Sequence, residues 1–219
     1  MTLAPPPRSA PAPVGILFDM DGVLVESTET WFRAVEEAGR RFGGRVITRE
    51  QFLPTFGQGA DGDVEAFGLT CTPQELDAFY LAYFLEHAQS SLYVDPAAAP
   101  VLRGLAARGI RRSVVTNTMA ELAAHILRAA GLWDLFDAVV CADEVANAKP
   151  APDPLLEGCR RLGLATSEVW MIGDSRFDAE AAAAAGVWFV GLRRDGDVRL
   201  EALGELLALA PQRPPDSSR

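Results

Sequence analysis

Apolar residues along the chain follow two periods, one typical of strands and one typical of helices. Short apolar runs with β-branched or aromatic residues predict buried strands, over Val14–Phe18, Ser113–Thr116, Ala138–Cys141, Val169–Ile172 and Val187–Leu192. Between them, apolar residues three and four positions apart predict helices, over Ala98–Ala107, Ala120–Ala130, Leu155–Leu162, Ala179–Ala185 and Leu200–Leu209. Alternating strands and helices imply right-handed crossovers with helices on both faces of a sheet. The pattern therefore predicts a doubly wound α/β fold with a mostly parallel sheet.

The alternation stops between about Thr28 and Tyr93, where only helical patterns occur. The helices predicted in this stretch span Thr30–Phe42, Arg49–Phe56, Gly62–Phe67 and Pro73–Gln89. Thr48 and Thr72 are expected to cap two of them, because a hydroxyl before the first turn accepts a hydrogen bond from a free backbone N–H.

These patterns together predict how the chain is divided. We expect residues 14–27 and 93–210 to form a Rossmann-like core and residues 28–92 to form an all-helical cap inserted into it. Residues 1–13 and 211–219 are rich in Pro with Ala or Ser. Such composition is typical of disordered tails.

The composition restricts the possible classes of function. Hydrophobic residues make up 49% and charged residues 23% of the 219 residues, the balance of a globular chain with a substantial core. The formal net charge is −10, whereas nucleic acids and anionic membranes are bound through clustered Lys and Arg. The longest nearly continuous apolar run, Ala181–Leu192, is shorter than the roughly 20 residues of a membrane span. We expect no nucleic-acid partner and no membrane partner.

Location and redox chemistry follow from two further features. The N-terminal sequence MTLAPPPRSAPAP has neither the basic nor the apolar region of a secretion signal, so a cytoplasmic protein is expected. The three cysteines form no CxxC pair, and there are two histidines. These numbers and spacings of Cys and His disfavour a disulfide framework, a zinc site or a His-based catalytic triad.

Two carboxylates follow the first predicted strand. Asp19 and Asp21 are two positions apart, so an extended chain directs both side chains to the same side. Gly22 then allows the chain to turn away sharply. A helix-cap or turn aspartate is the alternative for either residue. In open parallel sheets, however, ligands bind beyond the carboxyl ends of the strands, which makes this pair a candidate site.

Polar residues also follow three other predicted strands. Thr116 and Asn117 end the second strand, where a hydroxyl and backbone N–H groups suit an anion, although such residues also cap helices. Lys149 follows the third strand and is the one lysine among 20 basic residues. A solvated cation is the alternative, but a chain that otherwise uses Arg has a local reason for this lysine. Asp174 and Asp178 follow the fourth strand.

Four converging carboxylates would repel one another without a cation. Ligands that are all oxygen, together with a phosphate substrate, favour Mg²⁺. An aspartate can act as nucleophile through an aspartyl-phosphate intermediate, while a second acid protonates the leaving oxygen and then activates water. A lysine and Mg²⁺ offset charge on the transferring group. The strand ends therefore predict metal-assisted phosphoryl transfer.

Four segments resemble, in order and spacing, the motifs of the haloacid dehalogenase superfamily of phosphohydrolases: FDMDGVLVES, VVTN, AKPAPD and MIGDSRFDAEAAAAAG. The resemblance covers roughly residues 14–192. The helical insertion is similar to the cap of the subfamily that includes phosphoglycolate phosphatases and β-phosphoglucomutases. The resemblance implies a Mg²⁺-dependent phosphatase, monomeric or homodimeric, that acts on a small phosphorylated metabolite such as a sugar phosphate or a phosphoglycolate-like acid.

The same resemblance implies a role for each acidic residue. Asp19 would be the nucleophile, and Asp21 would be the general acid and base. The Asp19 and Asp174 carboxylates and the main-chain carbonyl of Asp21 would hold the metal. Asp178 would not bind the metal directly but would orient the residues that do.

The remaining motif residues would bind phosphate. Thr116 and the backbone of Asn117 would hold the phosphoryl group, and Lys149 would neutralise both it and the nucleophile. The similar dehalogenases lack the acid at Asp21, which argues against hydrolysis of carbon–halogen bonds. The similar mutases carry His where this chain has Trp31. A β-phosphoglucomutase-like phosphotransferase and a non-catalytic phosphate-binding regulatory protein remain alternatives.

The sequence of the predicted cap indicates less about function than the sequence of the core does. The stretch 57–63 is expected to be an ordinary flexible connection between helices, with a loop over the active site as the alternative. Aromatic residues at helical spacing are expected to form the core of the cap rather than a ligand site; they are Trp31, Phe32, Phe79, Tyr80, Tyr83 and Phe84.

Overall fold

The computed structural model describes residues 11–87 and 92–210. Its main sheet is six-stranded, in the order β5-β4-β1-β6-β7-β8, and all of its pairings are parallel. The strands are β1 Gly15–Phe18, β4 Arg111–Val115, β5 Ala138–Val140, β6 Val169–Gly173, β7 Trp188–Leu192 and β8 Val198–Leu200. The predicted doubly wound parallel sheet is confirmed.

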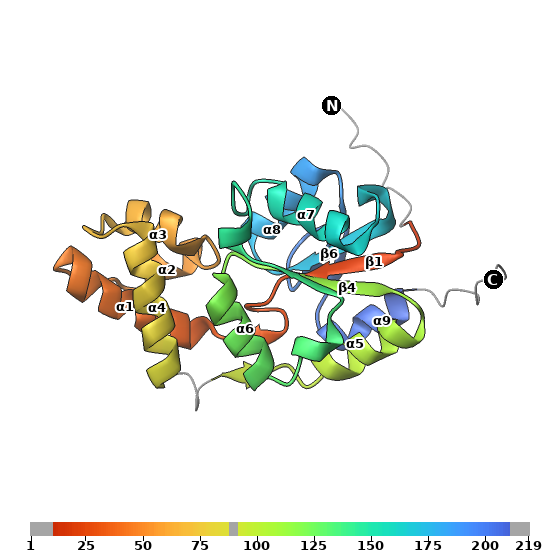
Figure 1. Ribbon diagram of the computed structural model, residues 1–219, viewed down its shortest axis with the longest axis horizontal. Helices are drawn as coiled ribbons and strands as arrows, with labels where there is room; N and C mark the ends of the chain where they lie inside the picture. Colours follow the sequence, from red (N-terminus) through yellow and green to blue (C-terminus); the bar gives the residue numbers. More distant parts are fainter. Residues whose placement is uncertain (1–10, 88–91, 211–219) are drawn as a thin grey trace.

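Helices cover both faces of this sheet. Figure 1 shows α7 and α8 on one face and α5 and α9 on the other. The side chains of β1 alternate accordingly: Ile16 and Phe18 belong to one buried apolar cluster and Leu17 to another, as a period of two requires. The helices of the core are α5 Ala98–Ala107, α6 Ala120–Ala129, α7 Asp153–Leu162, α8 Arg176–Ala185 and α9 Leu206–Leu209.

The helical insertion lies between β2 Val25–Glu26 and β3 Tyr93–Val94, at the left of Figure 1. Its helices are α1 Thr28–Gly43, α2 Arg49–Phe52, α3 Gly59–Phe67 and α4 Pro73–His87. The predicted caps are confirmed. The hydroxyls of Thr48 and Thr72 each accept a hydrogen bond from the backbone N–H three residues on, and each threonine's own backbone N–H donates to the side chain of that same residue. None of the described helices is long and apolar enough to span a membrane.

One prediction about the elements is wrong in part, and one element was missed. Of the helix expected over Leu200–Leu209, only the later part is helical: Leu203–Glu205 forms a 3-10 turn and Leu206–Leu209 forms α9, whereas Leu200 ends the strand β8, which pairs with β7. The antiparallel pair β2–β3, where the chain enters and leaves the insertion, was not predicted. Two-residue strands are too short to show a period. The tails expected at 1–13 and 211–219 lie outside the described residues, apart from residues 11–13.

Candidate active site

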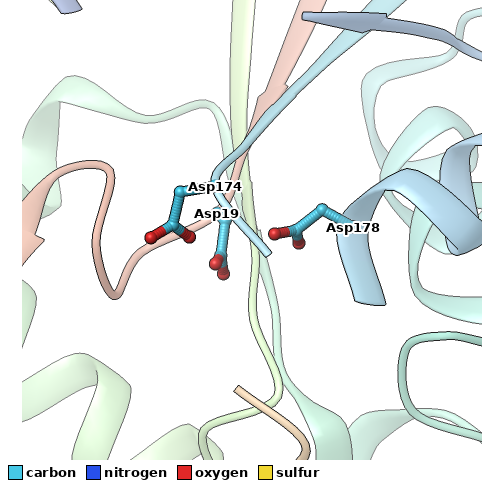
Figure 2. A group of neighbouring side chains, drawn as sticks. All are labelled: Asp19, Asp174 and Asp178. Atoms are coloured by element: carbon cyan, nitrogen blue, oxygen red, sulfur yellow. The ribbon is translucent and has the colours of Figure 1, made fainter. Parts of the chain in front are cut away.

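Three carboxylates meet at the carboxyl ends of the central strands. Asp19 directly follows β1, Asp174 directly follows β6, and Asp178 lies in the first turn of α8. Figure 2 shows their side chains directed toward a common space. One oxygen atom from each lies within 4.8 Å of the others. The sheet thus brings Asp19 together with two acids that lie 155 and 159 positions further along the chain.

Lys149 is enclosed by two of these acids. Its Nζ lies 2.8 Å from Asp19 Oδ1 and 2.6 Å from Asp178 Oδ1, and it donates to the carbonyl of Val115 at 3.0 Å. The residue is 3% exposed. Burial disfavours the charged ammonium, but the two carboxylates outweigh this effect and raise the pKa of Lys149 above its usual value. The lysine is therefore a fixed positive charge beside Asp19.

One ammonium does not balance three acids. Burial, and after it the charge of Asp178, raises the pKa of Asp19, and the same two causes raise the pKa of Asp174 to about 7. Asp174 Oδ1 is buried and has no hydrogen-bond partner among the described residues. An unsatisfied carboxylate oxygen in an all-oxygen cluster of excess negative charge fits a divalent cation such as Mg²⁺.

Asp178 is already held by other groups. Its Oδ1 accepts from Lys149, and its Oδ2 accepts from the backbone N and the Oγ of Ser175 at 3.0 and 2.6 Å. This is a capping box at the start of α8. Asp178 therefore orients Lys149 and leaves Asp19 and Asp174 free to face a cation.

Gly22 leaves room for this cluster. A Cβ atom added to Gly22 would lie 2.0 Å from Asp174 Oδ2, and the residue has a φ of +80°. Both the steric contact and the left-handed conformation exclude a larger residue. Gly22, which follows Asp19 and Asp21 in the sequence, is thus required by the position of the Asp174 side chain.

The Asp21 carboxylate lies outside this group of three acids. Its Oδ1 accepts hydrogen bonds from Ser27 Oγ and, at 2.9 Å, from Trp31 Nε1, and its Oδ2 accepts from Thr118 Oγ1 at 3.0 Å. Burial raises the pKa of Asp21, and these donors oppose the rise. Asp19 and Asp21 thus have different partners, which suits two different chemical roles.

Thr116 and Asn117 follow β4, as predicted. Thr116 is buried, and its Oγ1 accepts from the backbone N of Thr118 at 3.1 Å, which leaves its hydroxyl hydrogen able to donate. The side-chain amide of Asn117 donates to the carbonyls of Lys149 and Gly57, and its Oδ1 accepts from the backbone N of Lys149 at 2.8 Å. The Asn117 side chain therefore holds the loop that carries Lys149. Because this side chain is engaged, only the backbone of Asn117 is available for a ligand.

The comparison with known families agrees with this arrangement. The model of the haloacid dehalogenase-like hydrolase family matches residues 16–192, which include every candidate residue described above. The chain belongs to this family.

Individual relatives extend the comparison. The chain is 32% identical to the phosphoglycolate phosphatase of Escherichia coli K12 over 203 residues, 81% of this chain and 80% of the relative. Among solved structures it is similar to a haloacid dehalogenase-like hydrolase from Bacteroides fragilis, with 26% identity, a TM-score of 0.80 and coverage of 89% and 99% of the two chains. It is also similar to CbbY from Rhodobacter sphaeroides, solved in complex with phosphate, with 25% identity, a TM-score of 0.77 and coverage of 88% and 95%.

One prediction about the cap of this haloacid dehalogenase-like hydrolase is wrong. The stretch 57–63 is not an ordinary connection: Gly57 accepts a hydrogen bond from the Asn117 side chain at 2.9 Å, and α3 begins at Gly59. A Cβ atom on Gly59 would lie 3.3 Å from the Asn117 carbonyl oxygen. The glycines thus allow this segment to approach the core closely, which no period in the sequence reveals.

Trp31 combines two roles. Its ring contacts Tyr80 and Phe84 with centroids 5.2 and 4.5 Å apart, as predicted for the aromatic residues of the insertion. Trp31 and Tyr80 also line a cavity beside Asp21, which the prediction did not include. The Trp31 indole N–H also donates to Asp21, which the sequence analysis missed. The one available sequence signal was general: a buried Trp N–H usually finds a partner.

We expect Trp31→Phe to lower kcat of the hydrolase by roughly tenfold, the size of one hydrogen bond to a charged group. Phenylalanine keeps the ring contacts but cannot donate to Asp21, so KM should change little. Steady-state kinetics measure both constants. Trp133→Phe is the matched control, because Trp133 packs beside Arg128 away from the site. An unchanged kcat in Trp31→Phe would show that the indole N–H does not position Asp21.

Proposed function

We propose that this hydrolase is a Mg²⁺-dependent phosphatase that cleaves small phosphomonoesters through an aspartyl-phosphate on Asp19. The observation that carries the proposal is the separation of two buried aspartates. Asp19 lies beside Lys149 and the unsatisfied Asp174 carboxylate, whereas Asp21 is held apart by neutral donors. The division into a core of residues 14–27 and 93–210 and a cap of residues 28–92 is part of this proposal.

Charge neutralisation is the first requirement of the reaction. The Asp19 and Asp174 carboxylates and the main-chain carbonyl of Asp21 would hold Mg²⁺, which supplies positive charge to the phosphoryl oxygens. Lys149 adds a second positive charge beside Asp19. The hydroxyl of Thr116 and the backbone N–H of Asn117 would donate to the same oxygens.

Two steps then follow. In the first, an Asp19 oxygen bonds to phosphorus, the bond to the ester oxygen breaks, and protonated Asp21 gives its proton to the departing alcohol. In the second, Asp21 takes a proton from water while that water attacks phosphorus, which releases phosphate and regenerates Asp19. Asp21 ends protonated, ready for the next substrate, so protons balance over the cycle.

The substrate is expected to be a small phosphorylated metabolite. The related protein of E. coli is named phosphoglycolate phosphatase, and the similar CbbY structure holds phosphate. These names support the sugar phosphates and phosphoglycolate-like acids expected from the sequence as the first compounds to test.

Release of phosphate from a panel of phosphorylated metabolites tests the proposal. Purified protein should release phosphate from some members with Mg²⁺ and from none after the metal is chelated, with Asp19→Asn as the blank. No phosphate release from any compound of the panel, or equal phosphate release with and without Mg²⁺, would overturn the proposal.

Asp21→Asn is expected to slow turnover by about 10²–10⁴, the usual contribution of general acid–base catalysis. Asparagine cannot transfer the proton in either step, so both the formation and the hydrolysis of the phosphoenzyme should slow. Single-turnover kinetics separate the two steps. A loss smaller than about tenfold would exclude the assigned role.

The alternatives have less support. The similar mutases carry His at the position of Trp31, whose indole here donates to Asp21. A non-catalytic phosphate-binding protein would be expected to have lost a nucleophile, a lysine or a metal ligand. Asp19, Lys149 and Asp174 are all present, and the first two are in direct contact.

A further inference from the structure

A small cavity lies between the insertion and the core. Its volume is about 40 Å³, and one water needs roughly 10–15 Å³ on this measure, so the cavity holds a group of only a few heavy atoms. Asp21 and Thr116 line it from the core, and Gln58 and Gly59 line it from the insertion. An alcohol that takes its proton from Asp21 would be placed here.

Two carboxylates line the side of this cavity formed by the insertion. Asp63 on α3 is buried, and it accepts hydrogen bonds from Gln58 Nε2 at 2.8 Å and from Tyr80 Oη at 2.7 Å. Asp77 on α4 has no hydrogen bond or ion pair with any described residue. Burial raises the pKa of Asp63 to about 6, and burial followed by the charge of Asp143 raises the pKa of Asp77 to about 6. Both carboxylates are mostly ionised at pH 7.

No positive charge balances these acids. Among the described residues, the lining of the cavity contains no Arg, Lys or His. The wider groove beside it is lined by Asp61, Asp77 and Asp143, and the one basic residue of its lining is Lys149, already paired with two carboxylates. An anionic group here would face like charges in a site of reduced dielectric. A hydroxyl or an ammonium group would instead donate hydrogen bonds to them.

We propose that the substrate is a phosphomonoester of a small alcohol that carries a second hydrogen-bond donor, a hydroxyl or an ammonium group, and no negative charge. Asp63 and Asp77 accept from that donor while Asp21 protonates the ester oxygen. The inference rests on the proposed phosphatase activity, and it departs from the phosphoglycolate-like acids that the name of the E. coli relative suggests. Phosphoglycolate is disfavoured because its leaving group is anionic.

Three esters with the same two-carbon frame test this inference: 2-aminoethyl phosphate, 2-hydroxyethyl phosphate and 2-phosphoglycolate. With Mg²⁺ at pH 7, kcat/KM for at least one of the first two should exceed that for phosphoglycolate by about tenfold or more, as expected from nearby like charges. The comparison between the first two shows whether the favoured donor is ammonium or hydroxyl. Equal or faster hydrolysis of phosphoglycolate would overturn the inference.

Variants of the two carboxylates test the cause of the selectivity. Asp63→Asn and Asp77→Asn should each reduce the preference for the donor-bearing ester over phosphoglycolate by about threefold or more, because each removes one of the two charges. Asp77 is partly exposed and without a partner, so its variant should fold even if Asp63→Asn does not. Glu65→Gln, an exposed residue of α3, is the matched control and should keep the preference. An unchanged preference in Asp77→Asn and in any folded Asp63→Asn would overturn the inference.

Acetyl phosphate separates failure of this inference from failure of the proposed function. It is small and activated, so any enzyme that forms the Asp19 phosphoenzyme should cleave it. Cleavage of acetyl phosphate with no hydrolysis of either donor-bearing ester would overturn the inference alone. No Mg²⁺-dependent cleavage of any of these compounds would overturn both.

Discussion

Asp19→Asn is expected to reduce phosphate release by at least about 10³-fold, the scale of losing a catalytic nucleophile. An amide oxygen is too weak a nucleophile to form the phosphoenzyme. The fold should survive, because asparagine can still accept the hydrogen bond from Lys149 Nζ, which now lies 2.8 Å from Asp19. The substitution also removes one of three mutually repelling acids. Phosphate release and thermal unfolding measure the two effects.

The control for this variant is Asp134→Asn. Asp134 is exposed in a 3-10 turn of the core, away from the ends of β1 and β6, so it should retain full activity. Phosphate release by Asp19→Asn within tenfold of the wild type would show that the nucleophile has been assigned to the wrong residue.

Lys149→Met is expected to lower the free energy of unfolding by about 3–5 kcal/mol, because removing one partner of a buried ion pair leaves uncompensated charge. Methionine has a similar length, so the effect reports charge more than a cavity. Asp19 and Asp178 would lose their shared counter-charge while remaining buried. Phosphatase activity should also be lost. Denaturant unfolding in the absence of Mg²⁺ measures the stability directly.

Arg160→Met is the matched comparison, because it breaks an ion pair with Glu157 at the surface. Exposed pairs contribute little to stability, so the unfolding midpoint of this variant should remain close to that of the wild type. An equally small change in Lys149→Met would show that the buried lysine does not offset the charge of the two aspartates.

The core of the fold was predictable because long-range and local preferences agree there. The strands β1 and β6 are short, continuous runs of buried residues, whereas β4 is buried only over its last three residues. The two-residue strands β2 and β3 carry no such period. Leu200, the last residue of β8, was included in a predicted helix because it continues a helical apolar spacing, whereas its place in the sheet depends on pairing with β7.

In the site, too, the features that follow from local sequence patterns were predictable, and those that depend on tertiary contacts were not. Asp19, Asp174 and Asp178 follow strands or begin a helix, so the rule that strand ends converge was enough to bring them together. The partners of Asp21 could not be predicted in that way. Trp31 reaches it from the insertion and Thr118 from the start of the α6 segment, 97 positions away. The Trp31 contact depends on how the insertion packs against the core, and the Thr118 contact depends on the path of the loop between β4 and α6. Local sequence patterns encode neither.

Mass spectrometry of acid-quenched protein tests the central claim most directly. Enzyme mixed with Mg²⁺ and acetyl phosphate and quenched within the first turnover should carry one phosphoryl group on the peptide that contains Asp19. The Asp19→Asn protein should carry none, and the adduct should decay as phosphate is released. Phosphate release without any adduct on that peptide, or an adduct on another residue, would contradict the account.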